Sequence, residues 1–151
     1  MSTKKNTATI EVLKENLEFL SDASKWLKRS YNQCKDINIG KSQSEDDFDK
    51  FESLTSRFAR AIDFLIHKVF RSIDTYEFED GGTILDVINH AHKRNIFESI
   101  DEIRALKDLR NDIAHNYHDD SLTEIFIDTL SYTPSLIKLI ENTQKYCERY
   151  F

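Results

Sequence analysis

The sequence predicts an all-α protein, built as an up-and-down bundle of about five helices. Its 151 residues include only three glycines and one proline, too few chain breakers for a turn-rich β-fold. Apolar residues recur at steps of three and four along most of the chain, which is the period of an amphipathic helix. The length favours one domain, so we expect a single helical domain over residues 1–151, with residues 1–8 flexible.

Two long helices are predicted in the first half of the chain. The first ends near Gly40, and its apolar stripe consists of Ile10, Leu13, Leu17, Leu20, Leu27 and Tyr31. A polar loop follows, in which Ser42–Glu45 has the pattern of a capping box that opens the second helix. The second helix is expected to run to about Thr75, and its stripe consists of Phe51, Leu54, Phe58, Ala61, Leu65 and Val69.

Three more helices are predicted in the second half of the chain. The only glycine pair, Gly81-Gly82, ends the second helix. Two further capping boxes are expected at Ser99–Glu102 and Ser121–Glu124, each at the start of a helix. The three predicted helices cover residues 83–94, 99–117 and 121–150.

Membrane and secretory signals are missing from the sequence. The N-terminal segment lacks the apolar core of a signal peptide, and no apolar run approaches the roughly 18 residues of a transmembrane helix. We therefore expect a cytoplasmic protein without membrane contact.

Cysteine usage and charge limit the chemistry further. Cys34 and Cys147 are isolated, so no zinc site is expected, and one disulfide between them stays open. The net charge of −6 argues against a general nucleic-acid coat, which is usually basic. It leaves room for a local basic groove and suits a protein partner. Neither a cofactor nor a metal ion is implied.

The stretch RNDIAHNY, residues 110–117, places several reactive side chains on the fourth predicted helix. At about 100° per residue, the core face of this helix is formed by Ile103, Leu106, Leu109 and Ile113. Arg110 and Tyr117 fall at the edge of that face, and His115 lies roughly opposite it. Arg110 and His115 thus diverge by about 140°. They can meet on one phosphate only if the helix is distorted or a second subunit supplies part of the site.

Arginine and histidine together suffice for metal-free RNA cleavage. Arginine binds phosphate through a planar, permanently charged fork, and histidine transfers protons near neutral pH. The RNA 2′-hydroxyl supplies the nucleophile. Arg110 and His115 are therefore candidate catalytic residues, and Asn111 is a supporting residue that can position a phosphate oxygen or orient a side chain.

The spacing of Arg110, His115 and Tyr117 resembles the R-x4-H-x-Y motif of the HEPN superfamily, in particular of HepT-like toxins of the HepT/MntA type. The residue after the arginine is polar in that family and is Asn111 here. The helix order is also similar, with two long helices, a short third, the motif helix and a C-terminal helix. The resemblance therefore covers nearly the whole chain.

The resemblance implies a homodimeric, metal-independent endoribonuclease, the toxin of a type VII-like toxin–antitoxin pair. Arg110 and His115 would form the RNase site in the dimer cleft. The implied partner is an MntA-like nucleotidyltransferase antitoxin, which transfers AMP from ATP to Tyr117. The homodimer could lie within a larger hetero-oligomer with it. Attached AMP adds negative charge and bulk beside Arg110, where it would compete with RNA phosphate. Nearby acidic residues such as Asp108 and Asp112 would restrain RNA binding.

Two groups of residues are weaker signals. His90–Arg94 looks like a metal or phosphate cluster, but side chains two residues apart on a helix point about 200° apart. A solvated basic helix end is the better interpretation. Trp26 and Phe19 lie off the main stripe of the first helix and indicate a second packing face, within the bundle or at a subunit contact. Several cations could line an RNA path, although ordinary exposed helix faces explain them equally well: Lys25, Lys28, Arg29, Arg57, Arg60, Lys68 and Arg71.

Two other hypotheses compete with the ribonuclease. The chain could be a non-catalytic HEPN subunit that binds substrate for, or partners, a minimal nucleotidyltransferase. It could also be a plain helical bundle in which the motif is a coincidence. The first alternative predicts a stable complex and no RNase activity from the isolated chain.

Overall fold

The computed structural model describes residues 3–39, 44–77, 79, 81–115 and 121–151. Every regular element in these residues is helical, which confirms the all-α prediction. The elements in chain order are α1 (Thr3–Cys34), α2 (Glu45–Phe64), a π-helical segment (Leu65–Phe70), α3 (Arg71–Tyr76), α4 (Ile84–Lys93), α5 (Ile100–His115), α6 (Leu122–Cys147) and a terminal 3₁₀ turn (Glu148–Tyr150).

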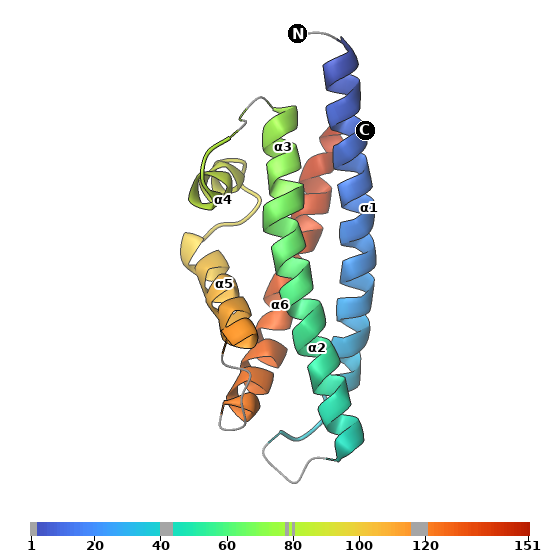
Figure 1. Ribbon diagram of the computed structural model, residues 1–151, viewed down its shortest axis with the longest axis vertical. Helices are drawn as coiled ribbons and strands as arrows, with labels where there is room; N and C mark the ends of the chain where they lie inside the picture. The colour runs from blue at the N-terminus through green and yellow to red at the C-terminus, as the bar shows by residue number, and fades with distance from the viewer. Residues whose placement is uncertain (1–2, 40–43, 78, 80, 116–120) are drawn as a thin grey trace.

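The elements form five helical rods, because α2, the π-helical segment and α3 follow one another without a break. In Figure 1, α1, the α2–α3 rod and α6 run lengthwise beside one another, and α5 lies along the lower part of the bundle. The short α4 is seen nearly end-on and lies across the bundle, which the simple up-and-down prediction did not include. Within the described part of the chain, no helix has both the length and the apolar character needed to cross a membrane. The expected flexibility of residues 1–8 stays a prediction.

The predicted stripes form the core. The following members are fully buried or nearly so: Leu13, Leu20 and Leu27 of α1; Phe51, Leu54, Phe58 and Ala61 of α2; Leu65 and Val69 of the π-helical segment; Ile103, Leu106 and Leu109 of α5. Ile10, Leu17 and Tyr31 are half-buried. The apolar period of the sequence therefore identifies the inner face of these helices correctly.

Side chains cap α2 and α4. Ser44 caps α2, where its Oγ accepts a hydrogen bond from the backbone N–H of Asp47 at 3.0 Å. The predicted box began at Ser42, which lies outside the described residues. Thr83 and Asp86 form a reciprocal capping box at α4 that the sequence analysis did not identify.

The predicted capping box at Ser121–Glu124 is wrong. Ser121 precedes α6, but its side chain makes no capping hydrogen bond. Its backbone has φ −101° and ψ −11°, whereas a capping side chain requires an extended backbone. The fourth helix does begin beside its predicted box, because α5 starts at Ile100, directly after Ser99.

A buried ionic network joins the end of α3 to α4. Asp74 accepts a hydrogen bond from Arg94 Nη1 at 2.5 Å, and its other oxygen lies 2.9 Å from His90 Nδ1. Arg94 Nε also donates to Glu77 at 3.0 Å, and only 8% of the Arg94 side chain is exposed. The interpretation of His90–Arg94 as a solvated basic helix end is therefore wrong for His90 and Arg94, whose side chains hold α4 on the bundle, whereas Lys93 is exposed.

The same network reaches the end of α6. Glu77 accepts hydrogen bonds from the hydroxyls of Tyr146, at 2.8 Å, and Tyr150. Burial and the bond to Glu77 raise the pKa of Tyr146. Burial lowers the pKa of Arg94, but its bonds to Asp74 and Glu77 outweigh this effect and raise it overall. The network therefore favours protonated tyrosine and charged arginine.

Both cysteines are free and buried, so the disulfide that the sequence left open is not formed. Burial raises the pKa of Cys34 to about 11 and that of Cys147 to about 12. The neutral thiols behave as small apolar core residues.

Removing the central carboxylate of the network should destabilise the protein. We expect Asp74→Ala to cost about 3 kcal/mol of unfolding free energy, because it leaves Arg94 buried without its main partner. Glu79→Ala is the control, because that carboxylate contacts His90 from a half-exposed position. Urea unfolding measures both variants. An equal, small effect of the two substitutions would contradict a stabilising role for the buried network.

Candidate functional site

The buried apolar face of the motif helix α5 determines where its reactive residues lie. Ile103, Leu106 and Leu109 are buried, and Ile113 packs half-buried against the same core. Arg110 is half-buried at the edge of this face, and His115 is exposed at the last position of the helix. The predicted orientation of both residues is confirmed.

Arg110 forms a bidentate ion pair with Asp63 of α2. Its Nε lies 2.8 and 3.0 Å from the two carboxylate oxygens, and its Nη2 lies 2.9 Å from Oδ2. The side chains of Arg110 and Asp63 are 33% and 38% exposed. The fork therefore fixes the direction of the guanidinium while leaving it accessible to a ligand.

Arg110 and Asn111 line one cleft between α5 and the α2 rod. The cleft has a volume of about 280 Å³ and is lined by Ile62, Asp63, Ile66, His67, Ile84, Lys107, Arg110 and Asn111. Its polar wall combines an arginine, a lysine, a histidine and an amide, which suits an anionic ligand such as a phosphate. Asp63 is the one carboxylate in that lining.

His115 is not among the residues that line this cleft. The described part of α5 is regular up to His115, so no helix distortion brings it to Arg110. One chain therefore does not unite these two predicted catalytic residues. The third motif residue, Tyr117, lies outside the described residues.

A π-helical segment forms part of the cleft wall, through Ile66 and His67. Four of its six residues, Leu65, Ile66, Val69 and Phe70, are buried. The segment leaves His67 and Lys68 exposed. Such segments are rare and occur frequently at functional sites. His67 of this segment lines the Arg110 cleft, which the sequence pattern does not reveal.

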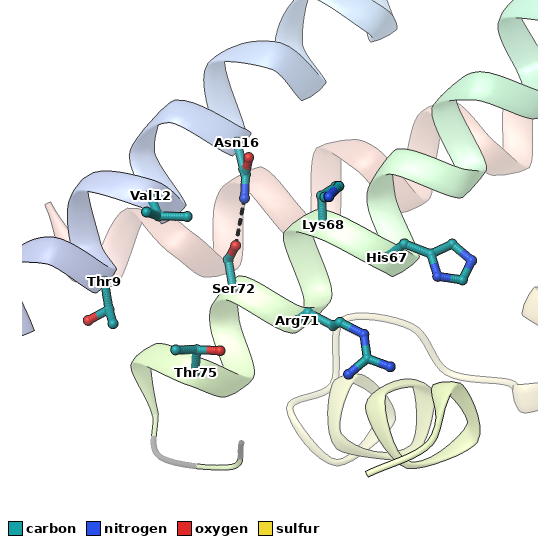
Figure 2. A pocket seen from close by; sticks show the side chains of 8 residues that line it. All are labelled: Thr9, Val12, Asn16, His67, Lys68, Arg71, Ser72 and Thr75. Carbon is teal, nitrogen blue, oxygen red and sulfur yellow. Dashed lines mark hydrogen bonds between the residues drawn. The ribbon is translucent and has the colours of Figure 1, made fainter. Parts of the chain in front are cut away.

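A second groove lies on the α1 side of the same segment. Figure 2 shows that Asn16 of α1 and Ser72 of α3 point toward each other across it, and Asn16 Nδ2 donates to Ser72 Oγ at 2.6 Å. His67 and Arg71 point away from this bond. The groove has a volume of about 470 Å³. The Asn16–Ser72 hydrogen bond connects its two sides, and its reactive side chains do not converge on one point.

Sequence reasoning missed three polar residues of the cleft: Asp63, His67 and Lys107. Lys107 precedes Arg110 by three residues, so helical spacing alone could have found it. Asp63 and His67 reach the cleft only through the register of α2 against α5, which one sequence does not reveal. In the described residues, no group of three or more histidine, cysteine, aspartate or glutamate side chains is placed to hold a metal ion.

The fork should couple Asp63 and Arg110 energetically. A double-mutant cycle with Asp63→Ala, Arg110→Ala and the double variant should give a coupling of about 0.5–1 kcal/mol, as for other partly exposed pairs. Lys107→Ala serves as the control for Arg110→Ala. Additive effects of the Asp63 and Arg110 substitutions in urea unfolding would show that the fork does not form in solution.

Comparisons with known proteins gave no match to a protein-family model, a curated protein or a solved structure. Any assignment of the chain to a family therefore depends on its own residues. The two grounds for an assignment are the R-x4-H-x-Y spacing that begins on α5 and the helix order described above.

Proposed function

We propose that the chain is a HEPN-type, metal-independent endoribonuclease that acts as a homodimer. It would be the toxin of a type VII-like toxin–antitoxin pair, neutralised by AMPylation of Tyr117 by an MntA-like nucleotidyltransferase. One observation carries the proposal. Arg110 is accessible at a polar cleft, and His115 is exposed five residues later on the same helix, at the spacing of the R-x4-H-x-Y motif.

The divergence of these two side chains supports a shared site. In a homodimer with twofold symmetry, two α5 helices packed across the axis would bring two arginines and two histidines to one groove. Arg110 of one protomer would then lie near His115 of the partner subunit. A monomeric site would need a bend in α5, which the described residues do not have.

The proposed reaction is an internal transesterification. The 2′-oxygen of the RNA forms a bond to the adjacent phosphorus while the bond from phosphorus to the 5′-oxygen breaks. The products are a 2′,3′-cyclic phosphate and a 5′-hydroxyl. His115 accepts the proton of the 2′-hydroxyl, and the leaving 5′-oxygen takes up a proton from solvent. Arg110 binds the non-bridging oxygens, where negative charge develops.

Asp63 would act as a positioning residue for Arg110. Its carboxylate fixes the Nε–Nη2 edge of the guanidinium, so a phosphate would approach a side chain that is already oriented. The same carboxylate also competes with phosphate for that edge. This balance limits RNA affinity and fits the overall negative charge of the chain.

The ribonuclease proposal makes a direct prediction for His115. We expect His115→Ala to abolish RNA cleavage and growth arrest without changing the fold, because the exposed side chain takes no part in the core. His92→Ala on α4 is the matched control and should retain activity. Cleavage is measured with purified protein, end-labelled RNA and a metal chelator. Full activity of His115→Ala would overturn the proposal.

The proposed modification of Tyr117 is tested by intact mass. Chain co-produced with a minimal nucleotidyltransferase encoded beside it should gain mass in AMP units and lose RNase activity. Tyr117→Phe should gain no mass and stay active in the same cells. Equal mass gain by Tyr117→Phe would place the modification elsewhere, and no gain by the unchanged chain would contradict this form of control.

One observation favours a second candidate function. Asp63 already occupies one edge of the Arg110 fork, as would suit a non-catalytic HEPN subunit of a minimal nucleotidyltransferase. This function predicts a stable complex with that enzyme and no cleavage by the isolated chain. The assay of the unmodified protein described above distinguishes the two functions.

A further inference from the structure

Trp26 of α1 is the only tryptophan in the chain, and it is 46% exposed. Three cations surround its ring. Lys25 Nζ lies 5.5 Å from the ring centroid, and the guanidinium carbons of Arg29 and Arg57 lie at 6.0 and 5.2 Å. A large aromatic side chain left in water among several cations is unusual for a purely structural position.

The surroundings of Trp26 are partly fixed and partly open. Arg57 of α2 donates to Ser30 Oγ at 2.7 Å and to the Trp26 carbonyl oxygen at 3.3 Å. These bonds tie α2 to the turn of α1 that carries the tryptophan. Beside the ring lies a cleft of about 240 Å³, lined by Ala23, Trp26, Arg57 and Arg60. The ring is thus held in place next to an open basic hollow.

The local charge is opposite to that of the whole chain. The chain carries a net charge of −6, yet four cations gather here: Lys25, Arg29, Arg57 and Arg60. Ser53 and Ser56 occupy the positions one turn before Arg57 and Arg60 on α2. The acidic residues nearest in the helical pattern are Asp22, one turn before Trp26 on α1, and Asp63, one turn after Arg60 on α2. The patch attracts anions in spite of the overall charge.

The patch continues toward the candidate site along α2. Arg57, Arg60 and Asp63 follow at steps of three, so they are neighbours on the helix surface. Asp63 is the residue that holds Arg110. Arg57 and Asp63 are separated by about 9 Å along the helix axis, at roughly 1.5 Å per residue. This is the length of about three stacked nucleotides at roughly 3.4 Å each.

We propose that Trp26 and the surrounding cations form a binding subsite for single-stranded RNA, in which an unpaired base stacks on the indole. Arg29 and Arg60 bind the flanking phosphates, and the strand continues along α2 to Arg110. The proposal deepens the ribonuclease function and rests on it for the direction of the strand. It adds a preference for unpaired RNA, because a base inside a duplex cannot reach the ring.

The shape and charge of the patch favour a single strand over other occupants. A phosphate chain complements four cations along its whole length. The surface of a second copy of this chain carries both signs of charge, although its net charge is −6. A membrane surface is flat and needs a wider apolar area than one indole.

The single tryptophan makes the test direct, because all indole fluorescence of the full-length protein reports on Trp26. The probe is a short 2′-deoxy oligonucleotide, which lacks the nucleophilic hydroxyl and cannot be cleaved by the proposed route. We expect saturable quenching by the single strand and little quenching by the matching duplex or by an abasic strand. The assay measures binding alone, so it does not depend on the ribonuclease activity.

Variants then assign the binding to these residues. Trp26→Leu should weaken binding of a labelled strand about tenfold or more, measured by fluorescence anisotropy, while Trp26→Phe retains most of it. Phe19→Leu is the matched control on the same helix, since Phe19 is also exposed but packs on Phe64. Arg60→Gln should lower the slope of log affinity against log salt by about 0.7, and Lys14→Gln should leave that slope unchanged.

Several results would overturn the subsite. These are no quenching by the single strand, equal quenching by duplex or abasic strand, or unchanged affinity of Trp26→Leu. Fluorescence that changes with protein concentration alone would assign the patch to a second copy of the chain, and a stronger response to anionic vesicles would assign it to a membrane. If the strand binds as expected but RNA is never cleaved, the subsite stands and the ribonuclease proposal fails. If RNA is cleaved without any response of Trp26, the reverse holds.

Discussion

The packing of α5 on the α2 rod is the constraint on which the candidate site depends. A helix that buries Ile103, Leu106 and Leu109 can turn only one edge toward α2, and Arg110 stands at that edge. The bidentate pair with Asp63 then fixes the arginine. His115 is turned away by the same geometry, because five residues rotate a helix by about 140° beyond one full turn. Core packing therefore determines that Arg110 pairs with Asp63 and that it lies apart from His115 of the same chain.

Cations are distributed unevenly over the described part of this acidic chain. Some cations are used internally, as Arg94 is with Asp74 and Glu77. Others stay at the surface of α1 and α2 around Trp26. The Arg110 cleft lies farther along α2, with Lys107 and His67 in its lining. One ridge of one helix thus connects an aromatic basic patch to the candidate catalytic arginine.

Sequence reasoning predicted the parts of the molecule that depend on local period. The helices, their buried stripes and the orientation of Arg110 and His115 follow from spacing alone. It failed where distant segments meet. The Asp63–Arg110 fork, the pairing of His90 and Arg94 with Asp74, and the crosswise α4 depend on the register between helices. The π-helical segment was missed because Leu65 and Val69 also fit an ordinary α-helical stripe.

The central claim is that two copies of α5 complete one catalytic site, and mixing inactive variants tests it most directly. Arg110→Ala and His115→Ala chains would be unfolded together, refolded as mixed dimers and assayed for RNA cleavage. We expect activity to return in the mixture, because each mixed dimer contains one intact arginine and one intact histidine in opposite protomers. A mixture as inactive as its two components, with mixed dimers demonstrated by mass, would contradict a site shared between subunits.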